Sequence, residues 1–426
     1  MTLTTALRLY GKQDIRLETF DLGEIGDNEI LADVQTDSIC MSTYKAYNLG
    51  PEHKRIPDNV AENPVIVGHE LSGVILAVGK NHQSKYRPGQ KYSIQPAMYY
   101  PGREFEAPGY SFAKLGGDAT KVIIPSEIME MDCLLPYEGE GHFKASLAEP
   151  VSCVIGGFNT MYHYKQGTYN HVMGPVKNGR MLILGGTGPM GLAAIDYALH
   201  GPYNPKLLVV TDISADRLAR AESLFPVEAA AKRGTRLIYA GVPAVTNDDL
   251  KAMADGVGFD DAFVFAPVTP LVEQAAAVLT LNGCLNFFAG PTDTTFSAKL
   301  NFYDVHYNEI HVACNSGGNT EDMLDALRLM GDGTLEPAVL ITHIGGLDAA
   351  AETIAHLPQI PGGKKLIYTH LEFPLIALDD LAKRADENAM YGKLAEIVAR
   401  HNGLWSNEAE AVLLAEAPRH NIPPKS

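Results

Sequence analysis

The chain has 426 residues, of which 46% are hydrophobic and 20% are charged, and its net charge at neutral pH is −17. This length corresponds to about two to three domains, and the acidic balance argues against unaided binding to nucleic acid or to anionic membranes. No apolar run reaches the ~18 residues of a membrane span. The N-terminus has no signal-peptide core and the five cysteines are scattered, so we expect a cytoplasmic protein.

Residues 1 to about 155 are predicted to be rich in β-strands. Short alternating or apolar runs are separated by Gly, Pro, Asn and Asp, which is typical of strands joined by turns. Many short strands in succession favour a distorted barrel over repeated strand–helix units. The expected strands are Thr5–Leu9, Glu29–Thr36, Ser72–Val78, Lys91–Gln95 and Thr120–Ile124.

The same region carries side chains that bind metals. Cys40 lies in SICMSTYK, His69 and Glu70 lie in NPVIVGHELSG, and Glu149 lies in SLAEPVSC. Thiolate, imidazole and carboxylate are the ligand set of catalytic zinc, which keeps one position open for water or substrate. A buried cysteine, a core histidine and a surface glutamate would leave the same pattern, so the residue types alone leave both interpretations open.

The run MLILGGTGPMG, residues 181–191, predicts a dinucleotide site. Four apolar residues form a strand, glycines follow with the spacing GxGxxG, and Asp212 ends the next apolar strand. The glycines permit a tight turn, close approach of a pyrophosphate and close helix packing, and the acid binds ribose hydroxyls. An ordinary glycine-rich strand–helix turn is the alternative. The loop residues expected to bind the coenzyme are Gly186, Thr187, Gly188, Pro189, Met190 and Gly191.

From about residue 157 strands and helices alternate, which predicts an α/β fold with a doubly wound parallel sheet of about six strands. The expected helices are Leu192–Leu199, Ser214–Ser223, Thr269–Leu281, Glu321–Met330 and Asp348–His356. The expected strands are Leu207–Val210, Arg236–Ala240, Asp260–Ala266, Cys284–Ala289, Glu309–Cys314 and Lys365–Thr369.

Residues 371–426 are predicted to form two helices packed on the core. Asp379 or Asp380 is a candidate cap for a helix that ends near Gly403, and Asn407 with Glu410 resembles a capping box. We expect Trp405 to be at least partly buried between the two helices.

Several motifs together resemble the zinc-binding medium-chain dehydrogenase/reductase family. They are GHExxGxxxxxG from Gly68 to Gly79, Arg87-Pro88-Gly89, Gly116-Gly117 before a strand, and Glu149-Pro150 ahead of the glycine-rich unit. The order holds over residues 5–370, and the chain is most similar to the sorbitol-dehydrogenase-type polyol and sugar-phosphate members. The resemblance implies a GroES-like catalytic domain (1–156), an NAD(P)-binding Rossmann domain (157–318), a return segment that completes the catalytic domain (319–370) and a helical extension (371–426).

The resemblance also implies roles for individual residues. Cys40 and His69 match zinc ligands, Glu70 matches a third ligand or its close neighbour, and Glu149 matches the glutamate that approaches the metal from the domain junction. Ser42 matches the hydroxyl that relays the substrate proton. Cys153, four residues after Glu149, is a possible rival ligand, although a buried structural role is the simpler interpretation.

Three departures from the family pattern concern the site. Thr43 and Lys45 replace an aspartate and a histidine, so the usual proton exit is in doubt, and Lys45 is a candidate to relay the proton or to bind an anion. Residues 71–132 contain no cysteine, which excludes a second, structural zinc, and the segment 98–114 must pack through Tyr and Phe. The segment 160–180 is longer than usual.

The implied activity is zinc-dependent, NAD(P)-linked reduction of a ketose 1-phosphate to a hexitol phosphate, with one zinc per chain. An unphosphorylated polyol dehydrogenase and a nucleotide-binding relative without turnover are the alternatives. Asp212 favours NAD(H), whereas Arg217 would favour NADP(H) if it turned toward a 2′-phosphate. Lys45, Arg103 and Lys114 are candidates for binding a substrate phosphate. The family fold also implies a homodimer or homotetramer that pairs through strand 284–289 or 309–314.

Overall fold

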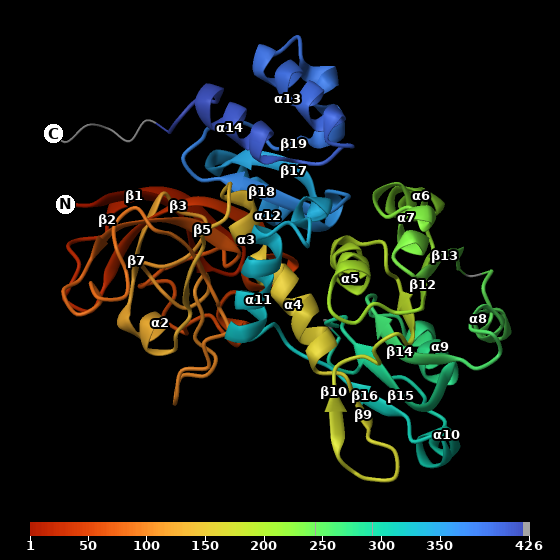
Figure 1. The fold of residues 1–426 in the computed structure, drawn as a ribbon. Helices are drawn as coiled ribbons and strands as arrows, with labels where there is room; N and C mark the ends of the chain where they lie inside the picture. The colour runs from red at the N-terminus through yellow and green to blue at the C-terminus, as the bar shows by residue number, and fades with distance from the viewer. Residues whose placement is uncertain (243, 292, 421–426) are drawn as a thin grey trace. The chain divides into compact units, whose positions relative to one another are not determined.

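A computed structural model describes residues 1–242, 244–291 and 293–420 of the chain. It contains two compact units: Met1–Glu149, Asn319–Asp332 and Ile341–Ser426 form the first, and Pro150–Gly318 and Gly333–Leu340 form the second. Figure 1 follows the chain through both units. Among the helices of the described residues, none has the length and apolar character needed to cross a bilayer.

The first unit is built on two β-sheets. An eight-stranded sheet has the order β19-β17-β18-β3-β5-β6-β8, with β7 also paired to β3, and a smaller sheet has the order β2-β1-β4. The strands are β1 (Leu3–Gly11), β2 (Asp14–Asp21), β3 (Ile30–Ile39), β4 (Val65–Ile66), β5 (Leu71–Val78), β6 (Lys91–Ile94), β7 (Lys121–Ile124), β8 (Leu134–Pro136), β17 (Ile341–Gly346), β18 (Lys364–Tyr368) and β19 (Ile376–Ala377).

Strand β3 is the centre of this unit because three strands pair with it. It is antiparallel to β5, β7 and β18, and its buried side chains Ile30, Ala32 and Val34 join the main apolar core. Burial of alternating apolar residues explains why the predicted strands of this region form a sheet. The helices of the unit are α1 (Met41–Leu49), α2 (Ser126–Glu130), α3 (Phe143–Ser146), α11 (Thr320–Gly331), α12 (Ala350–Ala355), α13 (Ala389–Arg400) and α14 (Asn407–Glu416).

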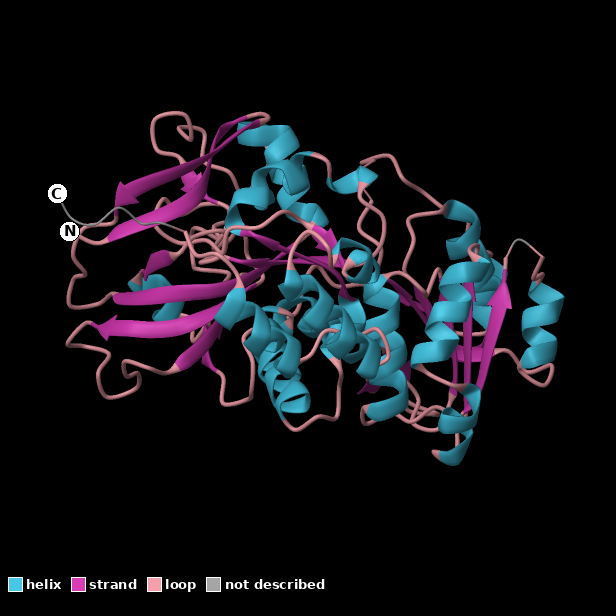
Figure 2. Ribbon diagram, turned by 90° about the horizontal axis from the view of Figure 1, so that it is seen from above, coloured by secondary structure: helices cyan, strands magenta, loops and turns pink. Residues whose placement is uncertain are grey.

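The second unit contains a six-stranded parallel sheet with the order β13-β12-β11-β14-β15-β16. This confirms the predicted doubly wound fold. Helices flank the strands, as Figure 2 shows. The strands are β11 (Arg180–Leu184), β12 (Leu207–Asp212), β13 (Arg236–Gly241), β14 (Phe259–Val264), β15 (Leu279–Phe287) and β16 (His311–Ala313). The helices are α4 (Ala148–Asn159), α5 (Pro189–His200), α6 (Ala215–Leu224), α7 (Val227–Lys232), α8 (Asn247–Met253), α9 (Thr269–Ala277) and α10 (Phe302–Tyr307). The first two residues of α4 belong to the first unit, and the second unit begins at Pro150.

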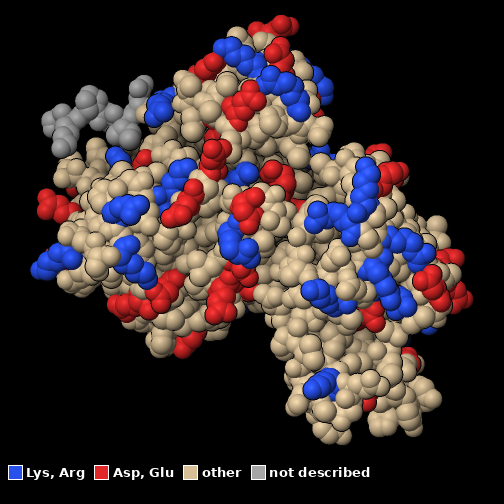
Figure 3. Space-filling view, in the orientation of Figure 1, with Lys and Arg blue, Asp and Glu red and all other residues tan. Residues whose placement is uncertain are grey.

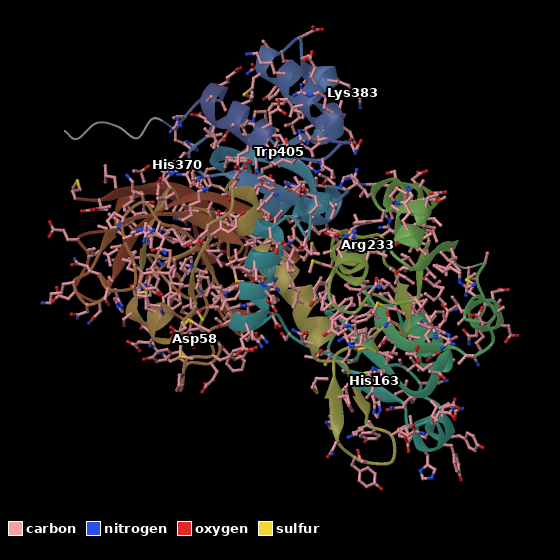
Figure 4. The ribbon with its side chains drawn as sticks, in the orientation of Figure 1. Asp58, His163, Arg233, His370, Lys383 and Trp405 are labelled. Carbon is pink, nitrogen blue, oxygen red and sulfur yellow. The ribbon has the colours of Figure 1, made fainter. Side chains whose placement is uncertain are left out.

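The unusually long segment 160–180 forms a hairpin of β9 (Tyr162–Tyr164) and β10 (His171–Met173). His163, labelled in Figure 4, anchors it. Its Nε2 lies 2.9 Å from a carboxylate oxygen of buried Asp261, and its Nδ1 lies 2.7 Å from the carbonyl of Asn282. Burial opposes the charge, but Asp261 raises the pKa of His163 above its usual value. Two acceptors on one imidazole indicate a protonated ring in a buried ion pair.

The C-terminal segment differs from the expected capping pattern. Asn388, rather than Asp379 or Asp380, caps α13, and two 3-10 turns lie at Leu378–Asp380 and Ala382–Arg384. Ser406 caps α14, so the predicted box of Asn407 with Glu410 does not form. The serine hydroxyl, one residue earlier than expected, accepts the amide of the third helical residue and leaves the glutamate available for another partner.

That partner is the start of α3. Glu410 is 2% exposed and accepts the backbone amides of His142 and Phe143 at 2.6 and 3.0 Å. The Tyr368 hydroxyl donates to the same carboxylate, and it accepts from the indole of Trp405. Trp405 is 1% exposed and lies among the C-terminal helices in Figure 4. A carboxylate at a helix N-terminus is favourable, so the extension is joined to the first unit by a buried polar network.

Two further expectations need correction. Helix α9 ends at Ala277 instead of Leu281, because β15 begins at Leu279 and pairs with β14. The segment 98–114 is only partly held by aromatic packing: Tyr110 is 5% exposed, whereas Phe105 is 59% exposed. Arg103 contributes instead through ion pairs with Glu106 and Glu127.

Candidate metal centre and coenzyme loop

Cys40, His69 and Glu70 come together in the first unit. Cys40 precedes α1 directly after β3, and the other two lie in the turn between β4 and β5. One ligand atom from each residue lies within 4.8 Å of the others. The turn requires Gly68, whose φ is +90° and whose absent side chain would lie 2.6 Å from the amide nitrogen of Asp118. The GHE motif therefore bends the chain so that both candidate ligands face the cysteine.

The chemistry of these three side chains fits a zinc ion. His69 is 4% exposed and Glu70 is completely buried. Burial lowers the pKa of His69, which keeps the imidazole neutral and able to bind metal. Burial also raises the pKa of the Cys40 thiol. A thiol, an imidazole and a carboxylate around one point match a catalytic zinc site with an open position.

Two partners that the sequence analysis missed hold Glu70. The Ser38 hydroxyl and the Lys364 ammonium each contact one of its carboxylate oxygens, and all three side chains are buried. Burial opposes the charge of Lys364, but Cys40 and Glu70 raise its pKa above the usual value. Lys364 starts β18, almost 300 residues after Glu70 in sequence, so only the antiparallel pairing of β18 with β3 brings the two together.

Glu149 approaches the same cluster. It lies in the first turn of α4 at the end of the first unit. Burial, followed by the charge of Glu70, raises its pKa to about 7, and its charge acts on both His69 and Tyr110. It is not among the three groups with the closest mutual distances. Cys153 follows on α4, is partly exposed, and is likewise outside that group.

Hydroxyl groups surround the candidate ligands. The Ser42 hydroxyl lies 3.0 Å from the Cys40 sulfur and 3.2 Å from His69 Nε2. The Thr43 hydroxyl lies 3.4 Å from His69 Nδ1. Tyr110, the other neighbour of the imidazole, has its hydroxyl 3.5 Å from Nε2. Thr43 therefore occupies the place from which an outer partner orients a metal-binding histidine.

A pair of buried aspartates lies behind the GHE turn and was not anticipated. Asp37 is 1% exposed and Asp118 is fully buried. Burial raises the pKa of Asp118 to about 7, and burial together with Asp118 and Glu70 raises that of Asp37. The structure packs the Asp37 carboxylate against Gly117, where a side chain would lie 1.9 Å from Oδ1. The second glycine of the Gly116-Gly117 motif is therefore required, because any side chain at that position would clash with Asp37.

The three candidates for phosphate binding are not brought together. Lys45 lies on α1 near His53, on whose pKa its charge acts. Arg103 is committed to its two glutamates, 3.1 and 2.9 Å away. Lys114 lies beside the turn at Gly23 and acts on Asp21 at the end of β2. Of the three, Lys45 is the one that lies on the helix directly after Cys40.

The coenzyme loop of the second unit connects β11 to α5. Gly188 is the residue before the helix and Pro189 is its first residue. A side chain at Gly191 would lie 2.3 Å from the Gly186 carbonyl oxygen, so the close packing inferred for the last glycine is required. Thr187 is 4% exposed, and Met190 lies in the first turn of α5. The helix N-terminus is thus open to an anionic group at the loop.

Asp212 ends β12 next to this loop. Its carboxylate accepts the amides of Thr187 and Ser214 at 3.3 and 3.1 Å. Arg217 forms an ion pair with it at 2.6 Å. Although burial acts in the opposite direction, these donors lower the pKa of Asp212 below its usual value. Arg217 is therefore half exposed, and its guanidinium pairs with the acid at the end of β12.

Comparisons with known proteins agree with this geometry. Residues 26–131 match the alcohol dehydrogenase GroES-like domain. The chain is 54% identical to L-sorbose 1-phosphate reductase from Klebsiella pneumoniae, with 98% of both chains covered. It is 47% identical to mannitol-1-phosphate 5-dehydrogenase from Aliivibrio fischeri, covering 97% of this chain and 98% of that one. The fold matches 2R,3R-butanediol dehydrogenase from Bacillus subtilis with a TM-score of 0.68 at 20% identity, over 86% of this chain and 99% of that one.

The GroES-like unit, the parallel coenzyme-type sheet and the thiol–imidazole–carboxylate cluster define a metal-dependent dehydrogenase. The chain belongs to the zinc-binding medium-chain dehydrogenase/reductase family, and it is an oxidoreductase of that family.

Proposed function

We propose that the protein is a zinc-dependent, NAD(P)-linked oxidoreductase that reduces a ketose 1-phosphate to a hexitol phosphate. The observation that carries this proposal is the 54% identity with L-sorbose 1-phosphate reductase over 98% of both chains. A second relative of similar coverage is also named for a hexitol phosphate. The complete donor set of Cys40, His69 and Glu70 supports turnover over a purely nucleotide-binding role.

We assign Cys40, His69 and Glu70 as the groups that hold one zinc ion, with Glu149 as an additional carboxylate facing the same place. When bound, zinc polarises the substrate oxygen and lowers the pKa of an alcohol at that position. Thr43 keeps the imidazole oriented through Nδ1. Lys364 and Ser38 fix the direction of the Glu70 carboxylate.

Proton transfer is assigned to Ser42. Its hydroxyl contacts both Cys40 and His69, so it lies beside the place where the substrate oxygen must bind. A hydroxyl can accept one proton while it donates another, which suits a relay. Lys45 follows on the same helix and replaces the histidine of relatives, so we assign it either the next step of the relay or the binding of a phosphate group.

The coenzyme is assigned to the loop Gly186–Gly191, with its pyrophosphate at the start of α5. Asp212 is placed to accept ribose hydroxyls and to repel a 2′-phosphate, which supports a preference for NAD(H). Its ion pair with Arg217 offers a cation at the same point, so use of NADP(H) is also compatible with this geometry. We therefore propose NADH as the preferred coenzyme without exclusion of NADPH.

Self-association is proposed at the open edge of the parallel sheet. Strand β16 is the edge strand, and uncharged side chains are exposed around it on β15, α10 and the β9–β10 hairpin. Figure 3 shows few charges over the hairpin and α10. In a chain of net charge −17, such a surface lets two copies approach with little repulsion. The exposed residues are Tyr169, Val172, Met173, Leu281, Phe302, Tyr303, Tyr307 and Val312.

Light scattering at micromolar concentration tests this proposal. The expected species is a dimer or a tetramer, and Val312→Arg should shift it to a smaller one by placing a charge in the edge strand. A wild-type monomer would remove the proposal.

The five cysteines form no disulfide framework, which supports a reducing compartment, and we place the enzyme in the cytoplasm.

The substrate proposal is tested by comparing a ketose 1-phosphate with the same ketose lacking phosphate, each with NADH and NADPH. We expect a kcat/KM at least about 100-fold higher for the phosphate ester, the size of two to three charge-assisted contacts. Metal analysis of the same preparation should give one zinc per chain. Equal kcat/KM for the two ketoses would instead support the unphosphorylated polyol dehydrogenase.

A further inference from the structure

A group of basic side chains lies beside the candidate metal centre. His53, Lys54 and Arg55 follow the 3-10 turn at residues 50–52, after α1. The chain then enters the core at Ile56, which is 5% exposed. The Ser111 hydroxyl donates to the Arg55 carbonyl at 2.7 Å and fixes the backbone at this point. The three basic residues are therefore presented by an anchored segment, which favours preorganised binding.

Tyr110 connects this group to the metal centre. The His53 ring stacks on the Tyr110 ring with centroids 5.6 Å apart and an interplanar angle of 6°. The Arg55 guanidinium lies 5.7 Å from the centroid of the same ring. The Tyr110 ring also lies against the His69 ring, with their centroids 5.0 Å apart. One aromatic ring thus separates the basic group from a candidate zinc ligand.

The charges of this group are not balanced by nearby carboxylates. Arg55 makes a long hydrogen bond to the Phe105 carbonyl, at 3.4 Å, and Lys54 lies 5.6 Å from the Phe105 ring. Within the described part of the chain, neither cation forms an ion pair with Asp or Glu. By contrast, Arg16 and Arg103 each pair with a carboxylate within 3 Å. Two such cations side by side make a local positive charge in a chain of charge −17.

The pKa of His53 is shifted by the same positive charges. Burial, together with the charges of Arg55, Lys54 and Lys45, lowers its pKa to about 4. The ring is therefore neutral, and its Nδ1 accepts the backbone amide of Arg55 at 3.3 Å. This leaves the ring proton on Nε2, where it is available as a donor. The group consequently offers a guanidinium, an ammonium and an imidazole N–H, with no acceptor of its own besides the occupied Nδ1.

We propose that Arg55, together with His53 and Lys54, forms the subsite that binds the phosphate group of the substrate. This inference rests on the proposed sugar-phosphate activity and names the residues that select it. A guanidinium binds two phosphate oxygens at once, and the ammonium and imidazole donors complete the charge. In a ketose 1-phosphate the ester oxygen is attached to the carbon next to the carbonyl. The phosphate must therefore lie close to the reacting oxygen. Arg55 and His69 meet this requirement through a shared neighbour, because they lie 5.7 and 5.0 Å from the Tyr110 ring.

The same donors would also suit a phosphate of the coenzyme, so the experiment separates the two sources. Arg55→Met removes the guanidinium and keeps an unbranched chain, and Arg55→Lys keeps the charge without the two-pronged contact. Arg103→Met is the matched control, because that arginine is committed to Glu106 and Glu127. Each variant is assayed with a ketose 1-phosphate, with the unphosphorylated ketose and with varied coenzyme. The inhibition constant of inorganic phosphate against the sugar phosphate is measured alongside zinc content and thermal stability.

Arg55→Met is expected to lower kcat/KM for the phosphate ester about 10- to 100-fold, the usual effect of losing hydrogen bonds to a charged group. The unphosphorylated ketose and the coenzyme KM should change less than about threefold, well below the ~10-fold that 1.4 kcal/mol represents. Inorganic phosphate should inhibit the variant more weakly than the wild type. For the phosphate ester, the kcat/KM of Arg55→Lys should lie between the values for Arg55→Met and the wild type. The kcat/KM of Arg103→Met should match that of the wild type.

Three outcomes would overturn the inference, and each is distinct. A rise in coenzyme KM with an unchanged ratio between the two ketoses would assign Arg55 to the coenzyme. An equal loss for both ketoses, with a lower melting temperature in Arg55→Lys as well, would assign it to the fold. If the wild type already treats the two ketoses alike and phosphate does not inhibit, the sugar-phosphate function fails first and the subsite fails with it.

Discussion

The candidate metal centre of the first unit and the coenzyme loop of the second unit use different construction principles. The loop and its acid lie within about thirty residues, and the anion-binding groups that the loop offers are backbone amides. The metal centre collects side chains from β3, α1, the GHE turn, α4 and β18. His69, Glu70 and Lys364 are buried, and the polar groups of this centre depend on one another for their hydrogen bonds. The effects of substitutions should therefore stay local in the loop, whereas in the metal centre they should also disturb the neighbouring polar groups.

The largest effect is expected for Cys40→Ser. Loss of the thiolate should release the metal and lower kcat/KM at least about 10³-fold, because metal polarisation of the substrate oxygen contributes several kcal/mol. Zinc content by mass spectrometry and circular dichroism check the two parts of this prediction. The second unit does not contain this residue, so its fold should persist. Cys153→Ser is the control and should retain metal. Wild-type turnover in Cys40→Ser would reject the assignment.

The second effect concerns the buried ion pair of Lys364 with Glu70. Lys364→Met leaves the carboxylate buried without its cation, which should lower the free energy of unfolding by about 3–5 kcal/mol. Urea unfolding of metal-free protein measures this. The double variant Lys364→Met with Glu70→Gln should recover much of the loss, because no unpaired charge remains.

Lys365→Met provides the neighbouring control for that measurement. The Lys365 ammonium donates to the carbonyls of Pro361 and Gly363, and burial lowers its pKa to about 8. Its removal should cost about 1 kcal/mol, the net value of ordinary hydrogen bonds. Equal losses in the two lysine variants would show that Glu70 does not depend on Lys364.

The difference between the two centres also explains what could be predicted from sequence. The glycines of residues 186–191 and the acid at 212 are recognisable because strand, turn, helix and acid follow one another in sequence, and the parallel sheet formed as expected. Cys40, His69 and Glu70 were identifiable through a family pattern, and the structure places them together. Their roles as ligands remain predictions.

What sequence reasoning missed depends on contacts between distant segments. Lys364 looks like an ordinary strand lysine until β18 pairs with β3. Glu410 matches a capping box by spacing, yet its carboxylate binds the amides at the start of α3. Asp37 and Asp118 carry no motif at all. A charged residue at the start of an otherwise apolar strand, as at Lys364, is the one signal that sequence alone offered, because isolated charges are rarely buried without a partner.

A smaller and more local effect is expected in the coenzyme loop. Asp212→Ala removes the ribose acceptor and frees Arg217, so kcat/KM with NADH should fall about 10- to 30-fold while NADPH loses less. Steady-state kinetics with both coenzymes measure the ratio. Asp216→Ala, on the exposed side of α6, removes the same charge and should leave the ratio unchanged. Strong NADPH selectivity in the wild type would show that the local geometry overrides Asp212.

The smallest effect tests the buried aspartates behind the metal centre. Burial raises the pKa of Asp118 to about 7, from an ordinary value of 3.8. Between these two values the folded protein keeps a proton that the unfolded chain has lost, so stability falls as the pH rises through this window. The substitution Asp118→Asn introduces an amide that is neutral at every pH and could donate to Asp37. It should therefore stabilise the fold by at least about 1.4 kcal/mol at pH 8, the equivalent of one pKa unit, and by less at pH 5.

Thermal unfolding of metal-free protein at pH 5 and pH 8 measures this difference. Asp132→Asn is the matched control, because Asp132 is exposed and pairs with Lys85 at the surface. That variant should change the melting temperature little at either pH, since exposed ion pairs contribute about 0–1 kcal/mol. A gain for Asp118→Asn that is larger at pH 5 than at pH 8 would mean that the carboxylate is charged and satisfied in the fold. The negative charge of Asp118 would then stabilise the fold around the metal centre, whereas the present prediction is that it destabilises it.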